Sequence, residues 1–317
     1  MTIHSRVSLI DYADREALYN RLEIQHNGSP ENTRVTANAL NQLIDLLTLE
    51  KIDENLYRGQ SEATDWGRVY GGQVIAQSLS AAKQQVAAER NVHSFHSYFL
   101  RPGDPSLPII FEVESNLDAG TISNRRVKAV QKGRPIFFMT CSFQVNMVGL
   151  DHGAAMPAAP EPDNLPRETD LLENNIQRAP EDWLPKFNAV RAIDFRTVDS
   201  TAKGAAAGRQ LWMKPTGALP ADPLIHQYVM AYASDFFFLA TATQPHDVSF
   251  VTDGMRMATI DHSIWFHRPF DFNDWLLYEM DSPSASNGRG FVRGQIFDRQ
   301  GRLVASTAQE GIMRIKR

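Results

Sequence analysis

The chain passes twice through the same order of expected elements, and this duplication restricts its fold more than any other feature. The segment Phe99-Leu-Arg-Pro102 returns as Phe266-His-Arg-Pro269, 167 positions later, and Gly133-Arg134 returns as Gly301-Arg302, 168 positions later. Two nearly equal offsets at separated places indicate two copies of one unit. The chain is therefore expected to fold as two similar halves.

Each unit combines a helix with strands that alternate between apolar and polar residues. In the first unit a helix opens at Gly71-Gly72, and strand patterns follow at 93–100, 108–114, 121–131 and 135–144. In the second unit a strand near 210–214 precedes an apolar helix at 224–240, and strand patterns follow at 257–267, 275–279, 290–297 and 303–313. A further amphipathic helix is expected at 37–47.

This order predicts an α+β fold, because the alternating β-α units of a doubly wound sheet are too few. Each antiparallel sheet is expected to wrap around its helix, and the edges of the two sheets can pair to make one pseudo-dimer from one chain. A Pro-rich, acidic stretch separates the units and predicts a linker. The predicted boundaries are 1–36 for an N-terminal extension, 37–150 for the first unit, 151–205 for the linker and 206–317 for the second unit.

The composition narrows the class of protein. The 317 residues are 43% hydrophobic, which is ample for a sizeable core, and the net charge of −5 argues against binding of nucleic acid over the whole surface. The single cysteine excludes an intrachain disulfide framework, and no secretory signal or membrane-spanning run is recognisable. We therefore expect a cytoplasmic protein without membrane insertion. The spacing of the nine histidines predicts no metal site.

Asp235 is the only acidic side chain in the apolar run 224–240, which is expected to be a buried helix. An ionised carboxylate that is buried without partners is costly, and the carboxyl end of a helix disfavours negative charge further. Two interpretations remain open from this pattern. Asp235 either turns out to solvent or caps a neighbouring element, or it is a catalytic carboxylate.

The chain offers no good nucleophile for covalent catalysis. Cys141 lies in an apolar strand pattern typical of a core, and the contiguous residues Asp261, His262 and Ser263 point to alternate faces of a strand. If the chain is a hydrolase, water is the expected nucleophile. Thr259 and Gln309 offer a hydroxyl and an amide that can hold a water molecule together with Asp235, although for each residue the sequence alone favours an ordinary surface or cross-strand hydrogen bond.

Several long motifs follow one another in an order that resembles one known family. They are Tyr57-Arg-Gly-Gln60, Tyr70-Gly-Gly-Gln-Val74, His93-Ser-Phe-His-Ser-Tyr-Phe-Leu-Arg-Pro-Gly103, Tyr232-Ala-Ser-Asp235, Ala258-Thr-Ile-Asp-His-Ser263 and Ala305-Ser-Thr-Ala-Gln-Glu-Gly311. From about Leu40 to Met313 the chain is similar to the acyl-CoA thioesterase II family, whose members are double hot-dog proteins. The resemblance implies a double hot-dog fold and the hydrolysis of fatty acyl-CoA to fatty acid and CoA.

The resemblance also implies roles for three side chains, with Asp235 accepting a proton from water while Thr259 and Gln309 orient that water. Backbone N–H groups at the helix start Gly71-Gly72-Gln73 are then expected to hold the thioester oxygen as charge develops. The alternative is that the two glycines only permit tight packing of the helix.

By the repeat offsets, Val92 is the first-unit equivalent of Thr259, and Cys141 is the equivalent of Gln309. Neither residue can do the same polar work, so we expect one active centre per chain. Acyl-CoA is the expected substrate, no cofactor is expected, and a homo-oligomer (dimer or tetramer) is predicted because hot-dog sheets often assemble further. Two alternatives remain. One is an enoyl-CoA hydratase-like enzyme, for which His246 is the only obvious partner of Asp235, and the other is a non-catalytic acyl-CoA binding module.

Overall fold

The computed structural model describes residues 30–62, 67–168, 192–198, 207–246, 248, 252 and 254–316. In the first half of the chain the elements are α2 (Pro30–Leu47), β1 (Glu50–Asp53), β2 (Leu56–Gly59), α3 (Gly71–Lys83), β3 (Arg90–Phe99), β4 (Ile109–Asp118), β5 (Ile122–Gln131), β6 (Arg134–Val145) and the 3-10 helix η1 (Pro162–Asn164). In the second half they are β7 (Ile193–Val198), β8 (Ala207–Pro215), α5 (Pro223–Ala233), the 3-10 helix η3 (Leu239–His246), β9 (Met255–Thr259), β10 (Asp261–Phe266), β11 (Leu276–Ser286), β12 (Arg289–Asp298) and β13 (Leu303–Ile315).

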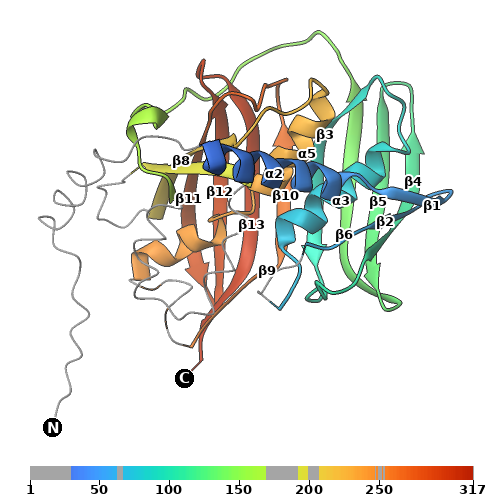
Figure 1. Cartoon of the computed structure of the whole chain (residues 1–317), viewed down its shortest axis with the longest axis horizontal. Helices are drawn as coiled ribbons and strands as arrows, with labels where there is room; N and C mark the ends of the chain where they lie inside the picture. Colours follow the sequence, from blue (N-terminus) through green and yellow to red (C-terminus); the bar gives the residue numbers. More distant parts are fainter. Residues whose placement is uncertain are drawn as a thin grey trace, which may run out of the picture.

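The strands of both units form one sheet, and equivalent strands of the two units follow in the same order when each half is followed inward from its edge. Its order is β1-β2-β4-β5-β6-β3-β10-β13-β12-β11-β8-β7, so each unit contributes one half, and β9 pairs with β13 beside this path. The halves join where β3 and β10 run antiparallel, with His96 opposite Ser263. The predicted α+β pseudo-dimer, made by pairing the edges of two duplicated sheets, is confirmed (Figure 1).

The two central helices lie together inside the curve of this sheet. Leu79 of α3 and Val229 of α5 have no exposed surface, and both belong to one continuous apolar core that spans the two units. Helix α2 packs against α3 and α5, so the three helices lie over the same face of the sheet (Figure 1). None of the described helices is both long and apolar enough to cross a membrane.

Several boundaries differ from the sequence-based prediction. Strand β7 falls inside the expected linker 151–205 and pairs with β8, so that part of the stretch belongs to the sheet. Helix α2 begins at Pro30 inside the expected N-terminal extension, whereas residues 1–29 lie outside the described residues. The hairpin of β1 and β2 was not predicted, because strands of four residues carry almost no periodicity.

The strand expected at 257–267 is two strands that meet at Ile260. Its N–H donates to the Glu310 carbonyl and its carbonyl accepts from the Phe99 N–H, so it links β13 with the end of β3. Among the described strands, β9 pairs with β13, while β10 pairs with both β13 and β3. The break places Thr259 and Asp261 in different strands.

The helix expected at 224–240 is shorter than predicted, because α5 ends at Ala233. Ser234 caps the helix, and Phe237 adopts a left-handed backbone with φ of 58°, which ends any regular continuation. The Ser234 N–H still donates to the Met230 carbonyl, but the Ser234 carbonyl accepts from the Tyr278 hydroxyl instead of from a further turn of helix. Apolar composition alone did not reveal this end.

Candidate active site

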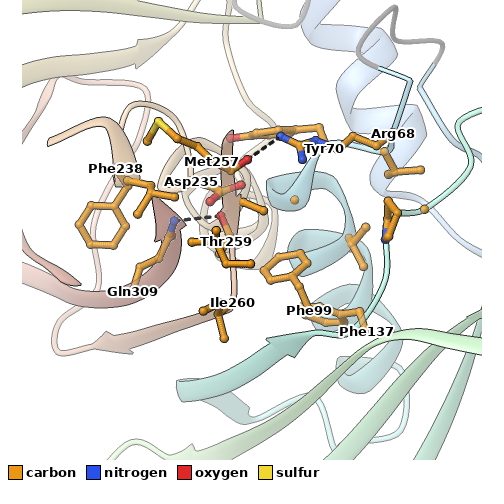
Figure 2. A pocket seen from close by; sticks show the side chains of 18 of the residues that line it. Arg68, Tyr70, Phe99, Phe137, Asp235, Phe238, Met257, Thr259, Ile260 and Gln309 are labelled. Atoms are coloured by element: carbon orange, nitrogen blue, oxygen red, sulfur yellow. Dashed lines mark hydrogen bonds between the residues drawn. The ribbon is translucent and has the colours of Figure 1, made fainter. Parts of the chain in front are cut away.

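A cavity of about 540 Å³ opens between the two units. Its walls are mostly apolar and come from the start of α3, the end of β3, the segment after α5, and β9. The polar groups on the wall include Asp235, Thr259 and Gln309, together with two exposed arginines, Arg68 and Arg101. The cavity therefore combines an apolar chamber with one cluster of polar side chains (Figure 2).

Asp235 lies two residues beyond the end of α5, and its carboxylate is directed at the start of α3. It accepts a hydrogen bond from the Gly72 backbone N–H. A Cβ atom at Gly71 would lie 2.6 Å from Asp235 Oδ2, so only glycine leaves room for the carboxylate there. The sequence argument placed Asp235 at the unfavourable end of its own helix, whereas the structure places it at the favourable amino end of the other unit's helix.

Burial raises the pKa of Asp235 above its ordinary value, in spite of several stabilising neighbours. The neighbours that lower the pKa are the imidazole of His262, the Gly72 N–H, the guanidinium of Arg68 and the amide of Gln309. The net direction is upward because removal from water costs the carboxylate more than these groups return. A carboxylate with a raised pKa is a stronger base than an exposed one, which suits proton abstraction near neutral pH.

Thr259 and Gln309 come from neighbouring strands and meet beside Asp235. Thr259 ends β9, and Gly311 of β13 lies opposite it. The Gln309 side chain is almost fully buried, and its Nε2 donates to Thr259 Oγ1 over 3.0 Å. The same amide also donates to Asp235. The structure thus brings together the three side chains singled out in the sequence, and Figure 2 shows them facing one part of the cavity.

Two tyrosines fix the backbone that carries Asp235. Tyr70 donates its hydroxyl to the Tyr232 carbonyl over 3.0 Å, and Tyr278 donates to the Ser234 carbonyl over 3.2 Å. Carbonyls at the end of a helix lack partners within the helix, so these hydroxyls satisfy groups that would otherwise be unpaired in the core. The main chain just before Asp235 is therefore held by hydrogen bonds, as is the Asp235 side chain.

The three residues at the start of α3, Gly71, Gly72 and Gln73, make different contacts. Gly71 lines the cavity, whereas Gly72 uses its N–H for Asp235 and packs so closely on the Tyr232 carbonyl that a Cβ would overlap it. The Gln73 side chain lies outside the cavity wall, where it binds the Gln60 carbonyl and accepts from the Glu62 N–H. Of these three residues, which were expected to bind the substrate, Gly71 lies on the cavity wall, and Gly72 and Gln73 do not.

His262 is a member of the site that the sequence argument missed. Its side chain is fully buried, with Nδ1 2.5 Å from Gln309 Oε1 and Nε2 3.0 Å from Ser234 Oγ. Strand parity correctly separated it from Asp261 and Ser263, but its true partners lie 47 and 28 positions away. The available signal was a histidine on the inward face of an otherwise apolar alternation in β10.

The corresponding place in the first unit carries no such set of polar groups. The strand registers pair Phe95 with Cys141 in β3 and β6, where the second unit has His262 and Gln309, and Val92 takes the place of Thr259. Val92, Phe95 and Cys141 are all buried, and burial raises the pKa of the Cys141 thiol far above its ordinary value. These side chains cannot polarise a water molecule.

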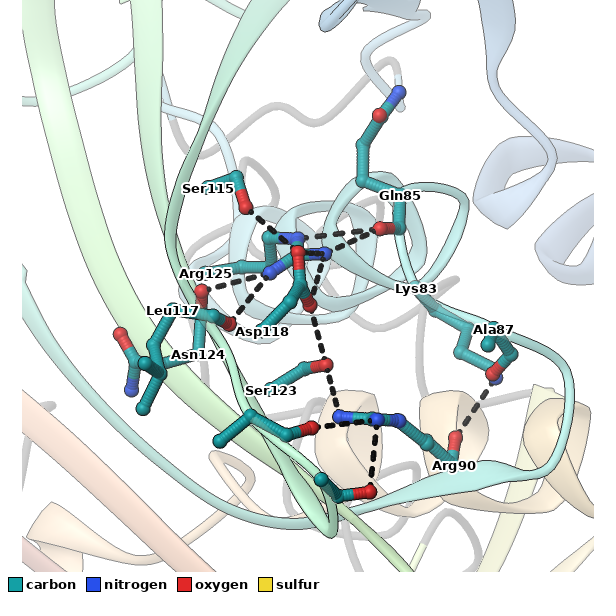
Figure 3. A network of polar contacts seen from close by, with 12 residues as sticks. Lys83, Gln85, Ala87, Arg90, Ser115, Leu117, Asp118, Ser123, Asn124 and Arg125 are labelled. Atoms are coloured by element: carbon teal, nitrogen blue, oxygen red, sulfur yellow. Dashed lines mark hydrogen bonds and ion pairs between the residues drawn. The ribbon is translucent and has the colours of Figure 1, made fainter.

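The far end of α3, beside those residues, is closed by a structural network. The almost fully buried Arg125 donates to the Gln85 carbonyl and forms an ion pair with Asp118, and Lys83 donates to three carbonyls of the following turn (Figure 3). Cys141 donates to the Arg125 carbonyl. Among the described residues at these equivalent positions, the set of acid, hydroxyl and amide therefore occurs in the second unit.

Both halves of the chain match family models. Residues 61–144 match the model described as acyl-CoA thioesterase N-terminal domain, and residues 186–312 match the one described as acyl-CoA thioesterase. The acyl-CoA thioesterase 2 of Haemophilus influenzae is 44% identical over 279 residues, which are 87% of this chain and 98% of that protein. The acyl-coenzyme A thioesterase 8 of Homo sapiens is 36% identical, with 86% and 88% covered.

Solved structures agree with these matches. The crystal structure of an acyl-CoA thioesterase II from Mycobacterium marinum is 37% identical and superposes with a TM-score of 0.72, over 86% of this chain and 98% of the other. A protein with a hot-dog fold from Alicyclobacillus acidocaldarius, 20% identical, superposes with a TM-score of 0.70 and covers 87% and 99%. The second likeness supports the fold alone.

Proposed function

The chain belongs to the acyl-CoA thioesterase family, and from this premise we propose that Asp235, Thr259 and Gln309 activate the water that hydrolyses the thioester. The reaction itself, acyl-CoA thioester to free acid and CoA, is that of the family. The observation that carries the residue assignment is the meeting of a buried carboxylate, a hydroxyl and an amide on one part of the cavity wall.

In the proposed step Asp235 accepts a proton from the water while the oxygen of that water attacks the thioester carbonyl carbon. Thr259 holds the water in line with Asp235, and Gln309 donates to both Thr259 and Asp235 and so fixes the positions of these two groups. Holding the water in this way lowers the entropy lost on reaching the transition state. The carbon–sulfur bond then breaks, and the CoA sulfur takes up the proton that Asp235 received. Asp235 returns to its starting state, and no covalent acyl intermediate forms.

The developing negative charge on the carbonyl oxygen needs a donor on the cavity wall. Gly71 is the first residue of α3, where backbone N–H groups have no partner within the helix. Gly71 lines the cavity beside Asp235, and its lack of a side chain lets a ligand approach the backbone. We assign the Gly71 N–H to the thioester oxygen, and the Gly72 N–H to Asp235.

The rest of the cavity supplies places for the two ends of the substrate. Val74, Ile136 and Phe137 belong to its apolar wall, which suits an acyl chain. Arg68 and Arg101 line the same cavity and are exposed, so their positive charges can attract the phosphates of CoA.

A hydratase-like reaction fits the site less well. His262, and not His246, is the histidine beside Asp235, but both of its ring nitrogens are engaged by Gln309 and Ser234. His262 is also absent from the cavity wall. It therefore cannot exchange a proton with a substrate carbon.

The test of the assignment is Asp235→Asn in a thiol-release assay with palmitoyl-CoA. We expect kcat to fall about 10²- to 10⁴-fold, the range that a general base contributes. Asp261→Asn is the matched control, since Asp261 opens the adjacent strand β10 and its carboxylate binds the Glu310 N–H instead of facing the cavity. If Asp235→Asn hydrolyses palmitoyl-CoA as fast as the parent, the assignment of Asp235 is wrong. If the parent itself binds palmitoyl-CoA tightly without releasing CoA, the chain is a non-catalytic binding module.

A further inference from the structure

Three buried side chains form a continuous hydrogen-bonded row that begins at Gln309 on the cavity wall and continues behind it. Ser234, His262 and Gln309 are all at most 1% exposed, and they come from the end of α5, from β10 and from β13. His262 lies in the middle, bonded to Gln309 through Nδ1 and to Ser234 through Nε2. The row ends at the amide that contacts both Thr259 and Asp235.

The hydrogens in this row can be assigned from the partners. The Gln309 amide group has two hydrogens, and its partners for them are Thr259 and Asp235, so Oε1 faces His262 and requires a donor. That donor is the Nδ1–H of a neutral imidazole, whose Nε2 then accepts. The Ser234 hydroxyl reaches both Nε2 and the Ala231 carbonyl, and its single hydrogen goes to Nε2 in this arrangement.

The opposite arrangement would disable the site. If His262 carried its hydrogen on Nε2, its Nδ1 would accept from a reversed Gln309 amide. The reversed amide would then point its oxygen at Asp235, which repels it, and at the place where the water must be held. The tautomer of His262 and the orientation of the Gln309 amide are therefore set together.

We propose that His262 is a positioning residue that holds the Gln309 amide with its N–H groups toward Asp235 and Thr259. This inference rests on the proposed function, because it acts only through Gln309. The first unit supports the coupling, since the places of His262 and Gln309 are taken there by the apolar side chains Phe95 and Cys141. At these equivalent positions the first unit therefore has neither the amide nor the imidazole.

Two amide substitutions separate the two ring nitrogens. In His262→Asn the side-chain nitrogen takes the place of Nδ1 and can still donate to Gln309, whereas in His262→Gln it takes the place of Nε2 and reaches Ser234 only. We expect kcat of His262→Asn to stay within about threefold of the parent, and kcat of His262→Gln to fall about 10- to 100-fold with little change in KM, as is usual for groups that orient a reacting side chain. A structural role would give both variants the same loss, which overturns the proposal.

A double-mutant cycle with Gln309→Ala decides whether His262 acts through Gln309. We expect His262→Gln to lower kcat in the parental background and to cause no further loss beside Gln309→Ala. The same factor in both backgrounds would overturn the proposal. The melting temperature shows whether His262→Asn folds. If it does not fold, a double-mutant cycle that combines His262→Phe, which keeps a ring, with Gln309→Ala replaces the comparison of the two amide variants.

These results are independent of the test of Asp235. Parental turnover by Asp235→Asn removes the proposed function whatever His262 does. An inactive Asp235→Asn combined with parental kcat for His262→Gln removes only the inference about His262.

Discussion

Asp235 is unusual in the sequence because a charged group stands in an apolar run, and the structure supplies the partners that such a group requires. The Gly72 N–H, the Gln309 amide and the Arg68 guanidinium favour its charged form, and His262 would do so if it were protonated. They do not offset burial completely, so the pKa of Asp235 stays raised. A base that is buried, reachable from a cavity and only partly neutralised is typical of a functional site.

The raised pKa of Asp235 predicts the pH dependence of the reaction. Only the ionised carboxylate can accept a proton, so kcat/KM is expected to fall as the pH drops through a pKa above the 3.8 of an ordinary aspartate. Removing a cation that lowers this pKa should move the acidic limb to higher pH. We expect this shift for Arg68→Ala and not for Arg101→Ala, since both arginines line the cavity and only Arg68 acts on Asp235.

The measurement is kcat/KM across the acidic range for the parent and both variants. Because only the position of the limb is compared, a general loss of CoA affinity does not affect the result. An acidic limb at the same pH in Arg68→Ala and in the parent would contradict the electrostatic role of Arg68.

At the scale of elements, the site depends on how closely the start of α3 approaches the end of α5. Gly71 and Gly72 are adjacent, but an added methyl group meets different atoms at each. At Gly71 it meets the end of the Asp235 side chain at 2.6 Å and the ring of Phe99 at 3.2 Å. At Gly72 it meets the backbone oxygen of Tyr232, which cannot move without moving α5.

The two alanine substitutions are therefore expected to fail in different ways. Gly72→Ala should lower the free energy of unfolding by about 1–3 kcal/mol or more, because the two helices must separate. Gly71→Ala should leave the free energy of unfolding close to the parental value and lower kcat about 100-fold by displacing the carboxylate. Urea unfolding and the thiol-release assay measure the two effects, and a fully active Gly71→Ala would show that the site tolerates a shifted Asp235.

At the scale of the whole molecule, the part of the chain that the structure describes contains two similar units and one set of the proposed catalytic groups. The second unit supplies Asp235, Thr259 and Gln309, and the first unit supplies the start of α3 and part of the cavity wall. In this proposal the site draws on described residues of both units. The predicted homo-oligomer remains a prediction.

Because the proposed site combines polar groups of the second unit with the helix start of the first, we predict one substrate site per chain. Titration calorimetry of Asp235→Asn with palmitoyl-CoA, in which turnover is suppressed, should give one equivalent bound per chain. The apolar Val92, Phe95 and Cys141, with the closed network around Arg125, leave no second set of groups to hold a thioester. Two equivalents of equal affinity would show that the first unit binds substrate as well.

Much of the fold was predictable because it rests on local patterns. Period-two alternation located nine strand regions, the repeat offsets predicted the pairing of two halves, and the carboxylate, hydroxyl and amide of the site were named in advance. The errors occurred where local pattern conflicts with long-range contacts. Apolar composition extended α5 past Ala233, and continuous alternation hid the break at Ile260.

The sequence by itself determined which groups are available for chemistry and that they occur once in two similar units. Only the tertiary structure decided what surrounds Asp235, because the amino end of α3 lies more than 160 positions away along the chain. It also decided that His262 faces Gln309 and not its own neighbours. Periodicity assigns a side chain to a face, but the partner on that face depends on which elements the closed sheet brings together.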